Sequence, residues 1–124
     1  MRIASAFFAA AVLLGSVAQP APARAQALNC EYGPIQREYG AQYWKVFACD
    51  DEKSVILVAG AGNRATPYVF TYSPSETDPE AYVLTGKGAG DPTYVGKARV
   101  QLEALRPGQI RDLYKAARAK GNGD

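Results

Sequence analysis

The N-terminal segment limits the fold most, because it predicts that the chain is exported and shortened. Arg2 precedes an apolar run over residues 3–18, and small residues then form two overlapping A-x-A patterns over residues 23–27. This order is typical of a cleavable secretory signal peptide. The apolar run is shorter than the ~20 residues that cross a bilayer, so we favour cleavage over a membrane anchor.

Removal of residues 1–27 leaves a mature chain that begins at Leu28, with Gln26 as the second choice of first residue. The remaining 97 residues (124 − 27) are enough for one domain with a thin hydrophobic core. We assign residues 28–121 to this single α+β domain and expect residues 122–124 to fray as a tail. The mature protein is expected in the periplasm or secreted, without a transmembrane span.

The charge of the mature chain argues against nucleic acid as a partner. The full chain has 14 basic and 12 acidic residues, and the expected signal peptide carries Arg2 and Arg24 but no acid. The mature balance is therefore 12 basic against 12 acidic residues, or zero. Proteins that bind nucleic acid ordinarily show a clear basic excess.

Cys30 and Cys49 are expected to form a disulfide. Export places these two cysteines in an oxidising compartment, and an even number of cysteines in a short exported chain indicates disulfide pairing. A C-x-x-C pattern is absent, so a structural bridge is favoured over a redox role. Residues 31–40 have mixed polarity, with Pro34 and two glycines, and we expect a loop or irregular edge that the disulfide holds against the sheet.

Four segments are expected to form the strands of an antiparallel meander. Their aromatic and β-branched side chains favour strands, and turn residues separate them. The second segment is apolar on both faces, which is typical of a central strand that is covered on both sides or at least well buried. The expected strands cover residues 42–49, 54–59, 67–72 and 81–85.

One or two helices are expected after the strands. Residues 93–105 fit a helical face and a strand alternation almost equally, but the Asp91-Pro92 start favours a helix, and a fifth strand stays as the alternative. Residues 107–120 have the spacing of an amphipathic helix. Its apolar face consists of Ile110, Leu113, Tyr114 and Ala117. The sequence therefore predicts an α+β fold, with a small antiparallel sheet of about four strands and C-terminal helices packed on one face.

The chain has no histidine, which removes the commonest general base and the zinc sites that use imidazole. We expect no catalytic residue, no metal site and no cofactor. Paired carboxylates can still hydrolyse glycosides, but every candidate lies in an expected turn, where acids are ordinary. These candidates are Asp50, Asp51, Glu52, Glu76, Asp78 and Glu80.

The glycine-rich segment 86–90 is a weak candidate for an anion-binding loop. Backbone N–H groups before a helix can bind an anion. However, the segment lacks the G-x-x-x-x-G-K-[ST] spacing, and Asp91 stands where the third glycine of G-x-G-x-x-G would fall. We therefore favour an ordinary turn.

Basic residues on the last expected helix form the first candidate for a binding surface. Arg111, Lys115 and Arg118 share one helical face. Such a stripe suits an acidic partner or anionic lipid headgroups. A solvated helix face, whose charges favour the helix C-terminus, explains the stripe equally well.

Aromatic residues form the second candidate for a binding surface. Tyr68, Phe70 and Tyr72 line one strand face, with Trp44 expected nearby. We favour a role for these rings in the contact between sheet and helix, where large aromatics supply much of the burial. If that face is open, Trp44, Tyr68 and Tyr72 would instead suit a ligand or protein surface.

These observations favour a small, exported, non-enzymatic binding or interaction protein of the cell envelope. Its partner, an envelope protein or a surface ligand, is not specified by the sequence. The first alternative is a carboxylate-dependent hydrolase that acts on cell-wall or sugar substrates. The second is a structural component of the envelope.

Overall fold

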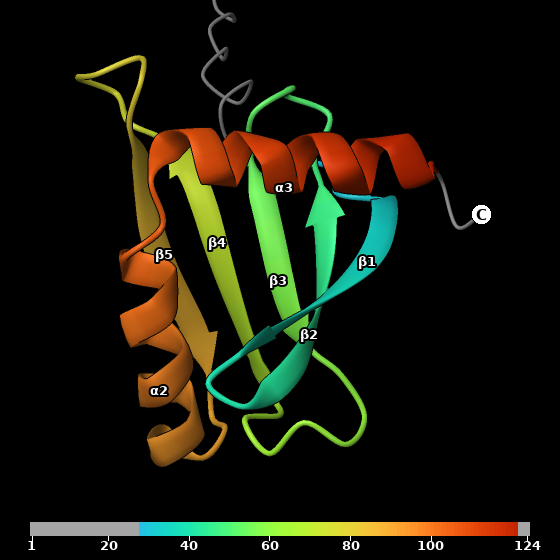
Figure 1. Ribbon diagram of the computed structural model, residues 1–124, viewed down its shortest axis with the longest axis vertical. Coiled ribbons are helices and arrows are strands. Elements are labelled where there is room, and N and C mark those ends of the chain that lie inside the picture. Colours follow the sequence, from blue (N-terminus) through green and yellow to red (C-terminus); the bar gives the residue numbers. More distant parts are fainter. Residues whose placement is uncertain (1–27, 122–124) are drawn as a thin grey trace, which may run out of the picture.

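Five strands and two helices follow one another within residues 28–121, the part of the chain that the computed structural model describes (Figure 1). The expected signal peptide, residues 1–27, and the expected tail, residues 122–124, lie outside these described residues. The elements are β1 (Tyr32–Tyr39), β2 (Gln42–Ala48), β3 (Val55–Ala59), β4 (Tyr68–Pro74), β5 (Tyr82–Gly88), α2 (Pro92–Glu103) and α3 (Pro107–Lys120).

The strands form one antiparallel sheet in the order β1-β2-β3-β4-β5, so the expected meander and the α+β class are confirmed. The sheet has five strands rather than four, because residues 32–39, within the segment expected as a loop or irregular edge, form the edge strand β1. Its register with β2 shifts between Tyr32 and Ile35. This irregularity accommodates Gly33-Pro34 in an edge strand, where proline is tolerated.

Residues 93–105 belong largely to a helix, as expected, and not to a further strand. The carboxylate of Asp91 accepts a hydrogen bond from the backbone N–H of Thr93 (2.9 Å), and Pro92 opens α2. Both features are typical of a helix N-terminus. None of the helices in the described part of the chain is long and apolar enough to cross a membrane.

The hydrophobic core lies between one face of the sheet and the two helices. Figure 1 shows α3 crossing the strands near one end of the sheet, and α3 contacts β1, β2 and β3. Alternation along each strand directs every second side chain toward the helices. The core includes Trp44, Val46, Val55, Leu57, Phe70 and Tyr72 from the sheet, and Val95, Ala98, Leu102, Ile110 and Leu113 from the helices.

The glycine-rich segment 86–90 is part of a strand over its first half. β5 continues to Gly88, beyond the expected end at residue 85. The ring of Tyr68 on the paired strand occupies the space where a Cβ at Gly86 would lie, and a Cβ at Gly88 would collide with the carbonyl of Pro67. These two glycines therefore allow an aromatic ring and a neighbouring backbone to approach closely, which glycine in a strand often marks.

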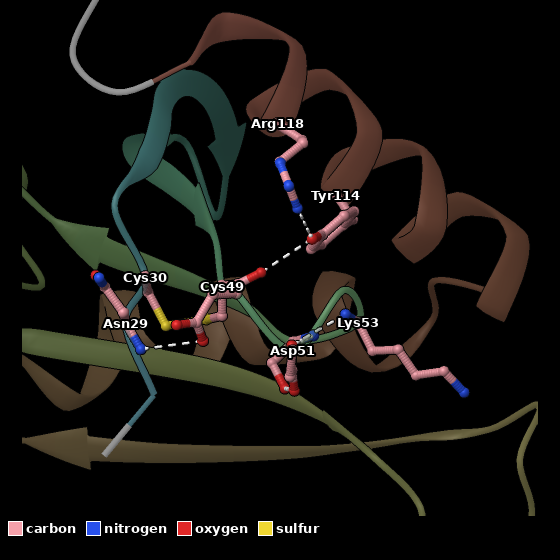
Figure 2. The surroundings of a disulfide bond; sticks show 9 residues. Asn29, Cys30, Cys49, Asp51, Lys53, Tyr114 and Arg118 are labelled. Atoms are coloured by element: carbon pink, nitrogen blue, oxygen red, sulfur yellow. Dashed lines mark hydrogen bonds between the residues drawn. A yellow bond between two sulfur atoms is a disulfide. The ribbon is translucent and has the colours of Figure 1, made fainter. Parts of the chain in front are cut away.

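The disulfide between Cys30 and Cys49 is confirmed. It joins Cys30, two residues before β1, to Cys49, the residue after β2, and so links the two strands at the end of the hairpin opposite its turn (Figure 2). Asp50 reinforces the closure, because its backbone N–H donates to the carbonyl of Asn29 (2.9 Å). The bridge thus holds this N-terminal segment against the sheet, as expected, and the segment forms an edge strand.

We expect Leu113→Ala to lower the free energy of unfolding by about 2–4 kcal/mol, since the leucine is a buried member of the core. Urea denaturation followed by tryptophan fluorescence measures the change. Val100→Ala is the matched control, because Val100 is also helical but 69% exposed, and its effect should stay within about 0.5 kcal/mol. Coinciding midpoints for Leu113→Ala and the parent would show that α3 does not dock on the sheet.

Replacement of both cysteines by alanine is expected to lower the free energy of unfolding by about 3 kcal/mol, because the bridge closes a loop over a sequence separation of 19 residues. Hydrogen exchange should show the largest loss of protection in residues 28–40. A thiol reductant provides the control: it should destabilise the parent but leave the double variant unchanged. Equal stability of parent and variant would contradict a stabilising bridge.

Candidate functional site

A groove of about 480 Å³ runs beside α3 and brings together the three basic residues that the sequence singled out. One wall consists of α3, and the other of the turn between β2 and β3 and the loop between β4 and β5. Its lining residues are Glu52, Lys53, Pro79, Glu80, Tyr82, Arg111, Tyr114, Lys115 and Arg118. The volume is within the range of ~300–1,000 Å³ typical of small-molecule sites.

Two half-buried tyrosines give the groove its aromatic surface. Tyr82 opens β5, and its ring meets that of the buried Tyr72 edge to face, with 6.3 Å between the centroids. Burial raises the pKa of Tyr82, and nearby Arg111 opposes this shift. The Tyr82 hydroxyl is therefore protonated at neutral pH and can donate a hydrogen bond.

Tyr114 is fixed in the groove by hydrogen bonds on both sides of its hydroxyl. The hydroxyl donates to the carbonyl of Cys49 (2.9 Å) and accepts from Nη1 of Arg118 (2.7 Å), as Figure 2 shows. The guanidinium of Arg118 also lies over the ring of Tyr32, 4.0 Å from its centroid. Arg118 is thus oriented by two aromatic residues while it stays exposed to solvent.

The charged rim of the groove is positive. Four basic side chains, Lys53, Arg111, Lys115 and Arg118, face two acidic ones, Glu52 and Glu80, so the balance is 4 − 2 = +2. Arg111 and Glu80 form an ion pair at 3.8 Å, but their side chains are 49% and 81% exposed. Such an exposed pair contributes little, and water screens it. The rim therefore keeps its attraction for an anion.

The turn between β2 and β3 is held in shape by Asp51. Its carboxylate accepts hydrogen bonds from the backbone N–H groups of Lys53 (3.0 Å) and Ser54 (2.7 Å) and from the Ser54 hydroxyl. Burial alone would raise the pKa of Asp51, but these hydrogen bonds outweigh it and leave the pKa below its ordinary value. Lys53 Nζ then reaches the carbonyl of Pro79 across the groove (3.5 Å).

Trp44 and Tyr72, two of the three aromatic candidates, lie in the core and not on a surface. Trp44 is completely buried, and its Nε1 donates to the carbonyl of Tyr39 (3.0 Å). Tyr72 is 2% exposed, and its hydroxyl donates to the carbonyl of Leu102 near the end of α2 (2.6 Å). Burial raises the pKa of Tyr72, so this donor keeps its proton. The placement confirms the favoured role of these rings between sheet and helices.

Tyr68, the third aromatic candidate, is half-buried and does not line the groove. Its hydroxyl accepts a hydrogen bond from Nη2 of Arg99 (2.9 Å), and the Arg99 guanidinium lies 5.1 Å from the ring centroid of Phe70. This cluster fastens α2 to β4. Of the six candidate binding residues, the structure therefore unites Arg111, Lys115 and Arg118 and separates the three aromatics from them.

Sequence reasoning missed the two tyrosines of the groove. Tyr114 was assigned to the apolar face of α3, although its spacing of three residues from Arg111 and four from Arg118 places it beside the basic stripe. Tyr82 carried no such signal. It reaches the groove only because β5 pairs with β4 and the loop before it folds toward α3.

The six carboxylates considered for hydrolysis are spread over two turns. Glu52 and Glu80 line the groove, and Asp51 stabilises the turn between β2 and β3. Within residues 28–121, no three Cys, Asp or Glu side chains gather in a group that could hold a metal ion.

Comparisons with known proteins add no family to this description. No family model, no curated protein and no solved structure matches the chain. The α+β architecture does not imply an activity, because one architecture can host many unrelated functions. Function is therefore argued from the groove.

Tyr114→Phe tests the link between the groove and the disulfide. The change keeps the ring but removes the hydrogen bond to the carbonyl of Cys49, and we expect the free energy of unfolding to fall by about 1 kcal/mol. Tyr43→Phe is the control, because its side chain is exposed, and it should leave stability within about 0.5 kcal/mol of the parent. Denaturant midpoints measure both effects; equal values for the two variants would contradict the assigned hydrogen bond.

Proposed function

We propose that this chain is a small, exported binding protein of the cell envelope, without enzymatic activity, which holds an anionic ligand in the groove beside α3. One observation carries the proposal: two half-buried tyrosines lie within a rim of four basic side chains. Export to the periplasm or beyond the cell is supported by the signal-like pattern in residues 1–27 and by the Cys30–Cys49 disulfide.

The groove offers two kinds of contact at once. Tyrosine rings present apolar faces and a hydroxyl, which suit a ring-shaped ligand. Arginine and lysine donate charge-assisted hydrogen bonds to carboxylate or phosphate oxygens. Arg111 and Lys115 are one helical turn apart on α3 and both line the groove. A ligand that combines a ring with an acidic group can therefore contact the tyrosines and the basic rim together.

The preorganisation of the groove favours binding without a large conformational change. The Tyr114 hydroxyl is held by Cys49 and Arg118, and Lys53 bridges to the carbonyl of Pro79. Side chains that are already ordered lose less conformational entropy when a ligand arrives.

A hydrolase remains the second candidate, because Glu52 and Glu80 line the same groove. Glycoside hydrolysis needs one carboxyl group as a general acid and another as a nucleophile or base. We favour binding because the Glu80 side chain is 81% exposed and lies beside Arg111, whereas a carboxyl group that acts as a general acid typically lies in an apolar, buried pocket. A structural role in the envelope is the third candidate.

Titration with an acidic trisaccharide, trigalacturonate, tests the proposal. Shift changes in NMR spectra should centre on Tyr82 and Tyr114, and the combined Arg111→Gln and Lys115→Gln changes should weaken binding about tenfold, because two charged donors are lost. Lys120→Gln is the matched control, since Lys120 lies on the same helix but not in the groove.

Two results would contradict binding through the basic rim: equal affinity for the neutral trisaccharide galactotriose, or unchanged affinity in the double variant. The same mixtures distinguish the hydrolase. Release of new reducing ends that is lost in Glu52→Gln and Glu80→Gln would favour hydrolysis over binding.

A further inference from the structure

We propose that the sheet face opposite the helices docks an amphipathic segment of a partner protein that is apolar in its middle and acidic at both ends. This surface, called the open face here, is separate from the groove and does not depend on its ligand. The open face consists of Tyr43, Lys45, Phe47, Ile56, Val58, Val69, Thr71, Val83, Thr85 and Lys87.

The open face is apolar at its centre although both helices pack on the other side. Phe47, Ile56, Val58 and Val69 alternate with the core residues along their strands, and none of the four belongs to the hydrophobic core. A sheet that faces water on one side normally alternates apolar and polar residues. β3 instead carries apolar side chains on both faces. We take this as a sign that a partner covers the open face when the protein functions.

The strand register arranges this face in two rows across the sheet. In the first row Lys45 lies opposite Val58, Val58 opposite Val69, and Val69 opposite Lys87. In the second row, Phe47 and Ile56 are followed by two threonines, Thr71 and Thr85. The apolar middle of the first row is therefore flanked by Lys45 and Lys87, and the exposed Gln36 of the edge strand β1 lies beyond Lys45.

The spacing of the two lysines defines the partner. Lys45 lies on β2 and Lys87 on β5, which are three strand spacings or ~14 Å apart. On a helix laid across the strands, residues i and i+11 share one face and lie ~16 Å apart, a separation close enough for the long lysine side chains to span. A segment with acidic side chains at this separation and apolar ones between them matches the row in both charge and hydrophobicity. Glu38 on the edge strand β1 lies opposite Tyr43 on the same face, but outside this row.

A second copy of the chain fits the open face less well. In an aligned face-to-face pair, a two-fold axis along or across the strands would place the lysine ends of one row over those of the other. Among the described residues, neither Lys45 nor Lys87 has a carboxylate within ion-pair distance, so this repulsion would not be relieved. A lipid surface also fits less well, because the four central side chains are only partly exposed and lie between their neighbours.

The test uses fluorescein-labelled helical peptides of about 16 residues, long enough to hold a helix. The acidic probe has leucines on one helix face between two glutamates at positions i and i+11 of that face, and the basic probe has lysines in place of the glutamates. The full mature chain should bind the acidic probe at least about tenfold more tightly than the basic one, as measured by anisotropy.

Charge reversal makes the test specific. The combined Lys45→Glu and Lys87→Glu changes should invert the order of affinity for the two probes, a gain that an unfolded variant cannot produce. The control combines Lys97→Glu and Lys120→Glu, which change the net charge equally but lie on the helices; it should keep the order of the parent.

Other outcomes overturn the proposal. Binding of neither probe at millimolar concentration, or an unchanged order in the Lys45 and Lys87 variant, would exclude the acidic segment. Sedimentation of the parent as a dimer that Val58→Glu dissociates would assign the face to a second copy. Binding to vesicles of phosphatidylglycerol that is tighter than binding to the acidic probe, and lost in the charge-reversed variant, would assign it to a membrane.

Discussion

The rest of the structure depends on the attachment of α3 to the end of the β1–β2 hairpin that carries the Cys30–Cys49 disulfide. The Tyr114 hydroxyl donates to the carbonyl of Cys49, and the backbone N–H of Gly33 donates to the carbonyl of Gly121 at the end of the helix (2.8 Å). Because the disulfide fixes the position of Cys49 relative to β1, it also fixes the helix above the strands. The groove lies between α3 and the two turns, so it depends on this attachment of the helix.

Much of the fold could be predicted from local patterns, and the exceptions have identifiable physical causes. β2 and β4 alternate, β3 is a continuous apolar run and α3 has an apolar helical stripe, while the Asp91-Pro92 start identified α2. In contrast, β1 is an edge strand that contains Gly33-Pro34 and buries few side chains. Its strand character depends on pairing with β2, which no local pattern shows. The sequence also did not predict that β5 continues to Gly88, because the need for glycine at position 86 comes from the ring of Tyr68 on the neighbouring strand.

Local patterns also predicted only part of the candidate site. Helical spacing placed Arg111, Lys115 and Arg118 together, because a helix arranges its own residues. Tyr82 joins them through the pairing of β5 and the path of the preceding loop, which are tertiary features. The aromatic candidates show a different difficulty: alternation predicts that two faces exist, but it does not tell which face the helices cover. That choice buries Trp44 and leaves Phe47 on the open face.

Both proposed surfaces are basic although residues 28–124 carry balanced charge, with 12 basic and 12 acidic residues. Half of these acids lie in the turn between β2 and β3 and in the loop between β4 and β5, and only Glu52 and Glu80 among them line the groove. A balanced chain has little long-range field to steer a partner, and salt screens exposed charges beyond ~8 Å. Recognition therefore depends on short-range contacts, in which each lysine or arginine is combined with an apolar surface: the tyrosines in the groove and the valines on the open face. Because the two surfaces are built on opposite sides of one sheet, occupation of one leaves the other accessible.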